Sequence, residues 1–307
     1  MKWKYWDSRE DWTGPRSYLL ERGGVVVAHA GLWPVAFTTR SGELVQGIQM
    51  IDWAAARDAA GTGIVLVEKL AGIFDFIYSI GGSEMTQEVL PAFGFCEHAR
   101  TWRGARPFRP VTQILSHPQR NWKLGPRLVR NSLWALYPPL RSAGWQSTAL
   151  LPRAIPSDLT NRLSSGTPFF PRPPAFFEYL LRCPGAKFQL HLVRDPDGPR
   201  GLFALASVRR QLRVAGVWLC NPNMKALSEA YVLSQQAAAN MPNVCELVVQ
   251  GTEDQSSKAA AAAGFRIWPG PTVYLLDKKS KLTERFEFQL CDDDSTFFDN
   301  GGVSYWT

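Results

Sequence analysis

A chain of 307 residues with 45% hydrophobic and 12% aromatic side chains can build the cores of two ordinary domains, which excludes a wholly disordered protein. Its longest apolar stretch, residues 24–37, is interrupted by His29 and Pro34 and is shorter than the roughly 20 residues of a transmembrane helix. The net charge of +7 favours anionic partners, without choosing among a phosphate-rich cosubstrate, an acidic polymer and nucleic acid.

The cysteines and histidines suggest neither a disulfide frame nor a metal site. The five cysteines are odd in number and widely spaced, and they form no Cys-x-x-Cys pair, a pattern typical of reduced thiols. The four histidines lack metal-ligand spacing, so no metal is predicted. Because the polar, aromatic beginning of the sequence does not resemble a signal peptide, we expect a cytoplasmic protein without a transmembrane segment.

The first hundred residues predict a β-meander followed by a glycine loop. A short helix is expected over residues 3–12, and two β-rich runs on either side of Gly23-Gly24 predict a hairpin. A third strand, residues 44–51, leads to the loop Gly61-Thr62-Gly63, which opens an apolar helix. Such a turn can hold a phosphate on the first amides of the helix. A strand and a second helix follow, and Gly94-Phe95 ends that helix before another strand.

Residues 116–155 are rich in arginine and proline and predict a connection between two domains. At most one short helix is expected there, near residues 128–136. Scattered arginines of this kind are typical of a solvated linker, and the alternative is a basic face for an anionic ligand or a membrane surface. No cationic-aromatic periodicity indicates a specific nucleic-acid partner.

The second half of the sequence repeats the order of the first. Gly264-Phe265 follows Gly94-Phe95 by 170 residues, which indicates an internal duplication. We therefore predict an N-terminal domain over residues 1–115, the connection over 116–155 and a C-terminal domain over 156–307. Its expected elements are a helix at 175–182, strands at 187–193, 201–208 and 213–220, a helix at 225–240, a strand at 245–250 and a helix at 253–263.

Strand, glycine loop, helix, strand, helix, Gly-Phe and strand in this order resemble the core of the GNAT acyltransferase superfamily. In that family the loop reads Gln/Arg-x-x-Gly-x-Gly/Ala, and here it reads Asp58-x-x-Gly61-x-Gly63, followed by Gly94-Phe95. The resemblance implies an α/β (α+β) fold of two tandem GNAT-like domains, each a twisted mixed β-sheet flanked by helices. It also implies acyl transfer from acetyl-coenzyme A or another acyl-coenzyme A to the amine of a small molecule or peptide.

The resemblance also implies where the reactants would lie. Backbone amides of the loop and helix start would hold the pyrophosphate, and the strand before them would face the pantetheine and thioester. The residues expected to bind the cosubstrate are Met50, Ile51, Arg57, Ala60, Gly61, Thr62, Gly63 and Ile64. Asp52 is the candidate general base, although a strand-end carboxylate is the alternative. Tyr78 is the candidate acid for the leaving thiolate, with a plain strand aromatic as its alternative.

Several positions depart from the family pattern. Asp58 stands where Gln or Arg is usual, and its charge disfavours a pyrophosphate. Leu90 occupies the place of the usual tyrosine, and Ala260 does so in the second half. The second loop contains Pro222 and no glycine, so it lacks a donor amide where phosphate needs one. We therefore expect the C-terminal copy not to bind coenzyme A and instead to form the acceptor pocket with the first.

Two alternatives to an N-acyltransferase remain. One is a non-catalytic binding or scaffold protein on a degenerate GNAT fold. The other is a Fem-like aminoacyl transferase, a class that pairs two GNAT-like domains and often carries a helical arm. An open gap between the strands near Met50 and Phe76, with Asp52 facing it, would favour catalysis, whereas a gap filled by side chains would favour a scaffold.

Overall fold

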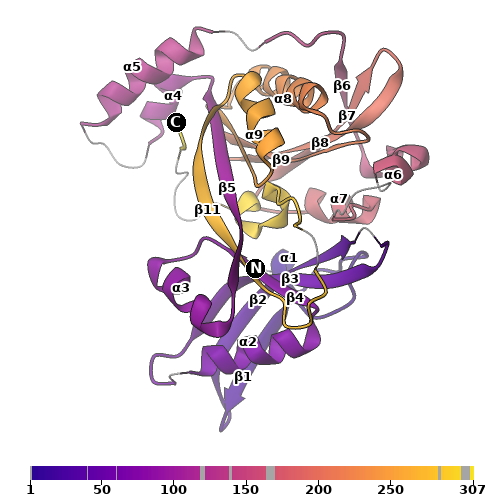
Figure 1. The fold of residues 1–307 in the computed structure, drawn as a ribbon. Helices are drawn as coiled ribbons and strands as arrows, with labels where there is room; N and C mark the ends of the chain where they lie inside the picture. Colours follow the sequence, from indigo (N-terminus) through magenta and orange to yellow (C-terminus); the bar gives the residue numbers. More distant parts are fainter. Residues whose placement is uncertain are drawn as a thin grey trace.

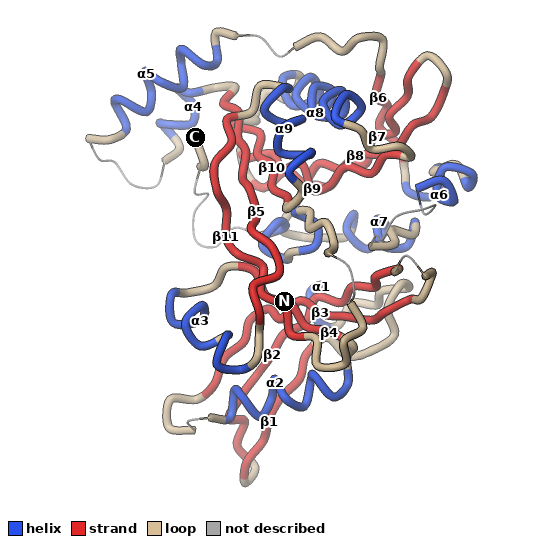
Figure 2. The backbone as a smooth tube through the Cα atoms, viewed as in Figure 1, coloured by secondary structure: helices blue, strands red, loops and turns tan. Residues whose placement is uncertain are grey.

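The computed structural model describes residues 2–39, 41–59, 61–117, 122–137, 140–163, 170–282, 285–298 and 305–307. Two lobes of strands and helices are joined in the middle by two long neighbouring strands, β5 (Cys96–Pro107) and β11 (Arg266–Leu276), as Figures 1 and 2 show. The architecture is mixed α/β, as the sequence predicted.

Both lobes contain three strands, a helix, a strand, a helix and a long strand in the same order. The first lobe has α1 (Lys2–Tyr5), β1 (Ser17–Arg22), β2 (Val25–Thr38), β3 (Leu44–Ala55), α2 (Thr62–Ile73), β4 (Phe76–Ile80), α3 (Glu84–Val89), η1 (Pro91–Phe93) and β5. The second has β6 (Gln146–Leu150), η2 (Pro152–Ala154), α6 (Ser157–Leu163), α7 (Pro174–Leu181), β7 (Lys187–Asp195), β8 (Gly198–Val208), β9 (Gln211–Leu219), α8 (Met224–Ala239), β10 (Glu246–Gly251), α9 (Asp254–Ala262) and β11. A tail with η3 (Leu290–Asp292) and η4 (Asp294–Phe297) follows.

The repeat is regular in its last three elements, because β10, α9 and β11 begin 170 residues after β4, α3 and β5. Equivalent turns also recur: Gly94 and Gly264 both have a positive φ, of 86° and 93°, directly before β5 and β11. These angles favour glycine and end the preceding helical turn in the left-handed conformation. The repeated order agrees with the sequence, while the duplication itself stays a prediction.

Two predicted stretches were wrong in detail. The helix expected over residues 3–12 ends at Tyr5, because Arg9 and Trp12 form an isolated β-bridge. The arginine- and proline-rich stretch after Trp102 has two helices among its described residues rather than at most one: α4 (Pro110–Leu115), which precedes the connection of residues 116–155, and α5 (Leu124–Ala135) within it. Pro110 and Pro126 lie in the first turns of these helices, where a missing N–H breaks no intrahelical hydrogen bond.

All eleven strands form one sheet, in the order β1-β2-β3-β4-β11-β5-β10-β9-β8-β7-β6. The pairs β3–β4 and β9–β10 are parallel, and the other neighbours are antiparallel. The last strand of each half is exchanged. β11 lies between β4 and β5 of the first half, and β5 lies between β11 and β10 of the second. Each half therefore completes the sheet of the other, and the limits at 115 and 155 stay a prediction.

Three buried clusters hold this arrangement together. One lies under α2 in the first lobe, and another lies under α8 and α9 in the second. The third joins the lobes, because Trp3 and Trp33 of the first half pack in it with Phe176 of α7 and Phe297 of the tail. In the described part of the chain, no helix combines the length and hydropathy needed to span a membrane.

The exchange predicts that the first half cannot fold alone. A fragment of residues 1–115 lacks β11, so the facing edges of β4 and β5 would be left without their partner strand. We expect the fragment to give no cooperative unfolding transition by circular dichroism, and co-expression with residues 116–307 to restore one. A cooperative transition of the fragment alone would contradict the importance of the exchange.

Candidate functional site

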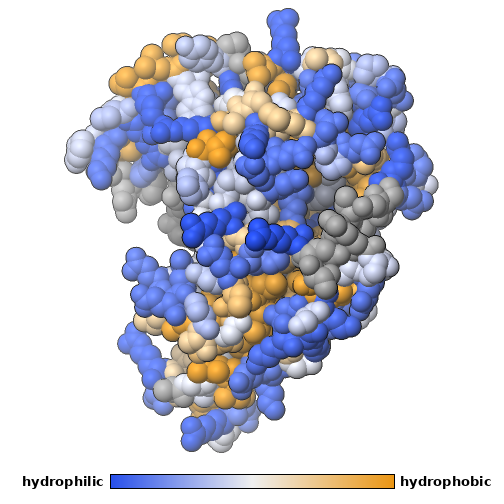
Figure 3. Space-filling model, in the orientation of Figure 1, coloured by the Kyte–Doolittle hydropathy of each residue, from blue (hydrophilic) through white to orange (hydrophobic). Residues whose placement is uncertain are grey.

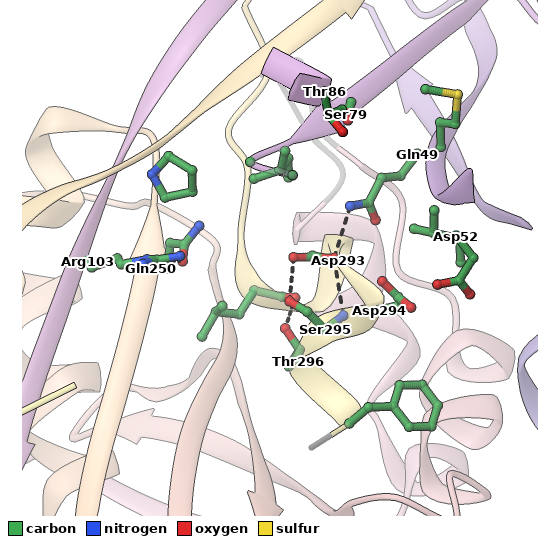
Figure 4. Close-up of a pocket in the computed structure, with 18 of the residues that line it drawn as sticks. Gln49, Asp52, Ser79, Thr86, Arg103, Gln250, Asp293, Asp294, Ser295 and Thr296 are labelled. Atoms are coloured by element: carbon green, nitrogen blue, oxygen red, sulfur yellow. Dashed lines mark hydrogen bonds between the residues drawn. The ribbon is translucent and has the colours of Figure 1, made fainter. Parts of the chain in front are cut away.

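A cleft of about 650 Å³ opens where β3 and β4 diverge. The two strands pair in parallel only from Gly47 with Phe76 to Gln49 with Tyr78. Beyond this point β3 continues to Ala55, while β4 ends at Ile80. The cleft is lined by residues 49–53 of β3, by residues 79–82 at the end of β4 and just after it, and by the tail, as Figure 4 shows.

A β-bulge turns the end of β3 into this cleft. Ile51 pairs with Gly31 and Ala54 with His29, so β3 carries an extra residue in this interval. Asp52 within it has a φ of 46°, a conformation that costs energy for a residue with a side chain. Lys4 and Tyr5 of α1 donate hydrogen bonds to the Asp52 carboxylate. Although burial alone raises its pKa, these bonds and the charge of Lys4 lower the pKa of Asp52 overall.

The tail supplies a second carboxylate to the same wall. Asp294 lines the cleft, and its carboxylate forms an ion pair with Lys4, which thus bridges Asp52 and Asp294. Burial and the neighbouring Asp293 raise the pKa of Asp294 to about 7, while Lys4 opposes that shift. Asp293 accepts a hydrogen bond from Gln49 Nε2 at 3.0 Å, which fastens the tail to β3 (Figure 4).

The opposite wall comes from the exchanged strand and the second half. Arg103 of β5 donates through Nε to Gln250 Oε1 of β10 at 3.2 Å, and Figure 4 shows both side chains across the cleft from Asp293. The guanidinium of Arg103 also lies 4.9 Å from the centre of the Trp306 ring. Gln211 and Arg213 of β9 complete this wall. The cleft is thus lined by both halves of the chain.

Two buried polar atoms that line the cleft have no partner among the described residues. These are Oε1 of Gln49 and Nε1 of Trp53, an acceptor and a donor. Buried groups of this type are nearly always hydrogen-bonded in folded proteins. A ligand that brings amide groups into the gap between β3 and β4 could satisfy both.

The corresponding gap in the second half is filled. β9 and β10 pair in parallel from Gln211 with Glu246 to Arg213 with Val248 and then diverge. Gln289 of the tail enters this gap, where its side-chain amide accepts from Val217 N at 2.6 Å and donates to Val217 O at 3.0 Å. A β-bridge between Gly251 and Gln289 closes the other side, and a cavity of about 10 Å³ remains between β9 and β10. A separate cavity of about 280 Å³ lies between β9 and α7, and no residue of β10 lines it.

The helices that follow the two gaps begin differently. α8 is capped by its own chain, because the Asn223 side chain accepts from Ala226 N at 2.9 Å. α2 instead begins after Gly61, which has no side chain and has open space around its Cα. The first turn of α2 therefore has no side-chain cap among the described residues, whereas that of α8 is capped by Asn223.

No protein-family model and no curated protein matches the sequence. Solved structures match the fold: an Anabaena variabilis GCN5-related N-acetyltransferase at 12% identity and TM-score 0.54, covering 86% of this chain and 63% of that one. A Saccharomyces cerevisiae N-myristoyltransferase with bound myristoyl-CoA matches at 14% identity and TM-score 0.55, covering 83% of this chain and 68% of that one. A tandem GNAT protein from the clavulanic acid biosynthesis pathway matches at 10% identity and TM-score 0.51, covering 87% of this chain and 85% of that one. The chain has a tandem GNAT fold.

The chain spans less than two thirds of the Anabaena protein. At identities of 14% or below these matches establish the GNAT fold, the fold of acyl-coenzyme A N-acyltransferases, and not the substrate. Among the residues predicted from the GNAT resemblance, Met50, Ile51 and Asp52 line the cleft. The fold therefore brings together one end of the predicted donor site and the predicted base.

The predicted phosphate loop lies apart from the cleft lining. Gly61, with a φ of 82°, begins α2 as expected, and Arg57 nearby is exposed. Two of the predicted donor amides are already used, since Thr62 N donates to Ala59 O at 3.2 Å and Ile64 N to Gly61 O at 3.0 Å. Gly63 packs under the Trp53 ring. Ala60 lies outside the described residues.

Tyr78 lies under the cleft rather than in it. Its side chain is fully buried, and its hydroxyl donates to Asp292 O at 2.7 Å. Burial raises the pKa of Tyr78 well above its usual value. Tyr78 is not among the described residues that line the cleft, so this position gives its predicted acid role no support.

Sequence reasoning missed the tail and the turn after β4. Asp293 and Asp294 belong to a run of three aspartates, residues 292–294, and no motif in the sequence marks them as cleft residues. Gly81 and Gly82 both have a positive φ, of 63° and 93°, and line the cleft at the entrance to α3. A Gly-Gly dipeptide directly after an apolar strand was the available signal.

The raised pKa of Asp294 predicts a pH-dependent stability difference. Because its pKa is about 7 in the folded protein and 3.8 is its ordinary value, folding favours the protonated form. The wild type should therefore lose stability as the pH rises toward 7, and Asp294→Asn should not lose this contribution. In urea unfolding, we expect the free energy of unfolding of Asp294→Asn minus that of the wild type to increase between about pH 5 and pH 7. The increase should be at least about 1.4 kcal/mol, the equivalent of one pKa unit. Parallel pH curves would contradict the assignment.

Proposed function

We propose that the protein is an acyl-coenzyme A-dependent N-acyltransferase whose donor enters the gap between β3 and β4. The observation that carries the proposal is the asymmetry of the two gaps. The first opens into a cleft of about 650 Å³, whereas the second is filled by Gln289 and retains about 10 Å³. A binding scaffold gives no reason to keep one gap open and close the other.

The residues at the first gap suit the pantetheine part of the donor. Pantetheine carries two amides, and the unpartnered Gln49 Oε1 and Trp53 Nε1 offer one acceptor and one donor to them. The start of α2 would face the phosphates, although the amides of Thr62 and Ile64 are already engaged. A bound thioester would supply an activated acyl group, and the protein would orient the amine and remove its proton.

We assign the general base to Asp294 in preference to Asp52. A base works best when its pKa lies near the operating pH, and the pKa of Asp294 is raised to about 7. The pKa of Asp52 is instead lowered by Lys4 and Tyr5, which makes it a weaker base. Lys4 contacts both carboxylates and would keep them in place as the proton moves. Asp52 then acts as a positioning residue through Lys4.

Binding of the donor tests the proposal directly. Ser79 of β4 lines the cleft, so Ser79→Phe should place a ring in the gap. In isothermal titration, we expect saturable binding of acetyl-coenzyme A or myristoyl-coenzyme A to the wild type. The variant should bind at least tenfold more weakly, a loss of about 1.4 kcal/mol.

The control is Met85→Phe, which adds a ring on α3 at a side chain that is 73% exposed. Its binding should equal that of the wild type. The two acyl-coenzyme A arms distinguish a short from a long acyl group. If neither ligand binds the wild type at millimolar concentration, the proposal fails, and the aminoacyl transferase and scaffold alternatives gain weight.

The base assignment predicts the pH profile of catalysis. With an amine acceptor found by screening, kcat/KM should rise with pH through about 7, because the carboxylate of Asp294 must be deprotonated to accept the proton. Asp294→Asn should lower kcat by about 10²–10⁴ and remove this ionisation from the profile. Asp52→Asn should cause a smaller loss and shift the profile instead. The opposite ranking of the two variants would return the base to Asp52.

A further inference from the structure

The helical pair α4 and α5 presents apolar side chains to solvent. On α5 and its flanks they recur at helical spacing, with Trp122 79%, Val129 62%, Leu133 59% and Leu136 75% exposed. On α4, the side chains of Val111 and Leu115 are likewise exposed. Figure 3 shows hydrophobic residues gathered at the upper left, over α5, at the outer edge of the molecule.

The inner side of this pair is polar. Asn131 and Gln113 are the fully buried side chains of the two helices, and Asn131 Nδ2 donates to Gln113 Oε1 at 2.9 Å. Gln113 Nε2 in turn donates to the buried carboxylate of Glu246 at 3.1 Å. Arg127 also points inward, where Nη2 donates to Tyr305 O at 2.6 Å. The pair is therefore attached by these hydrogen bonds and by the half-buried Leu128 and Trp134, and it still turns a stripe of apolar side chains to solvent, unlike an ordinary surface helix.

The stretch of sequence that contains these two helices is one-sided in charge. Residues 98–157 contain ten lysines and arginines and no aspartate or glutamate, whereas the other residues carry 24 basic and 27 acidic side chains. This segment thus holds the entire positive excess of the chain. Lys123 and Arg141 are exposed. Arg130 instead donates through Nε and Nη2 to Asn131 Oδ1, at 3.0 and 2.9 Å. Lys123 Nζ lies 6.0 Å from the centre of the Trp122 ring.

We propose that α4 and α5 dock on an anionic lipid surface. Apolar side chains with a tryptophan and flanking basic residues are the features of helices that lie in the membrane interface. The apolar stripe would enter the headgroup boundary, and the basic residues would contact the anionic headgroups. A nucleic acid would leave the stripe exposed, and a second copy of the chain would bring two surfaces of the same positive charge together.

Vesicle sedimentation of the full chain tests this surface without any acyl-coenzyme A. We expect binding to phosphatidylcholine vesicles that contain phosphatidylserine, weak binding without phosphatidylserine, and loss of binding at high salt. Val129→Asp with Leu133→Asp should weaken binding at least about tenfold, because two charges replace apolar side chains in the interface. Lys123→Gln should weaken it about fivefold, which corresponds to about 1 kcal/mol for the lost charge.

The matched control is Val25→Asp with Val26→Asp, two exposed apolar residues on the β1–β2 hairpin of the other lobe. These changes should leave binding unaltered, and unchanged melting temperatures would show that all variants fold. Absence of binding to anionic vesicles, or equal loss in the control, would overturn the proposal. Self-association of the wild type in light scattering that Val129→Asp with Leu133→Asp abolishes would instead assign the surface to a second copy. Binding to a nucleic acid duplex with no binding to vesicles would also overturn it.

Discussion

The exchange of β5 and β11 is the constraint on which the rest of the structure depends. Each strand is hydrogen-bonded on both sides within the other half, so neither half has a complete sheet of its own. The cleft lies beside these strands, and Arg103 on β5 brings a side chain of the first half to a wall made by the second. The relative position of the two halves is thus fixed by main-chain hydrogen bonds rather than by side-chain packing alone.

The tail makes the two similar halves different. Phe286 and Phe288 are buried in the central cluster, which anchors the segment. Gln289 then satisfies both main-chain groups of Val217 in the second gap, a place where a ligand would need the same hydrogen bonds. A few residues later, Asp293 and Asp294 reach the first gap. One segment therefore closes the second site and contributes its acidic residues to the first.

Sequence periodicity predicted the local elements well, because strands, the glycine turns and the 170-residue spacing are properties of neighbouring residues. It could not predict the exchange. β11 contains Pro269 and Pro271, which disfavour an interior strand, and only the three-dimensional sheet shows β4 and β5 on its two sides. The GNAT resemblance pointed to Met50, Ile51 and Asp52, which line the cleft, whereas Asp294, which also lines it, was missed. Its raised pKa depends on burial and on Asp293, and Lys4, which opposes the shift, lies 290 residues away in the sequence.

Lys4 explains why two carboxylates in one cleft can have different properties. It forms ion pairs with both, but Asp52 has a half-exposed side chain and a second donor in Tyr5, so its charged form is favoured. The side chain of Asp294 is only 14% exposed and has Asp293 as its neighbour, so burial and repulsion outweigh the same cation. Lys4 therefore contacts both Asp52, whose deprotonated form is favoured, and Asp294, which can take up a proton. Since one belongs to β3 and the other to the tail, the acid-base pair exists only when the tail crosses from the second half to the first.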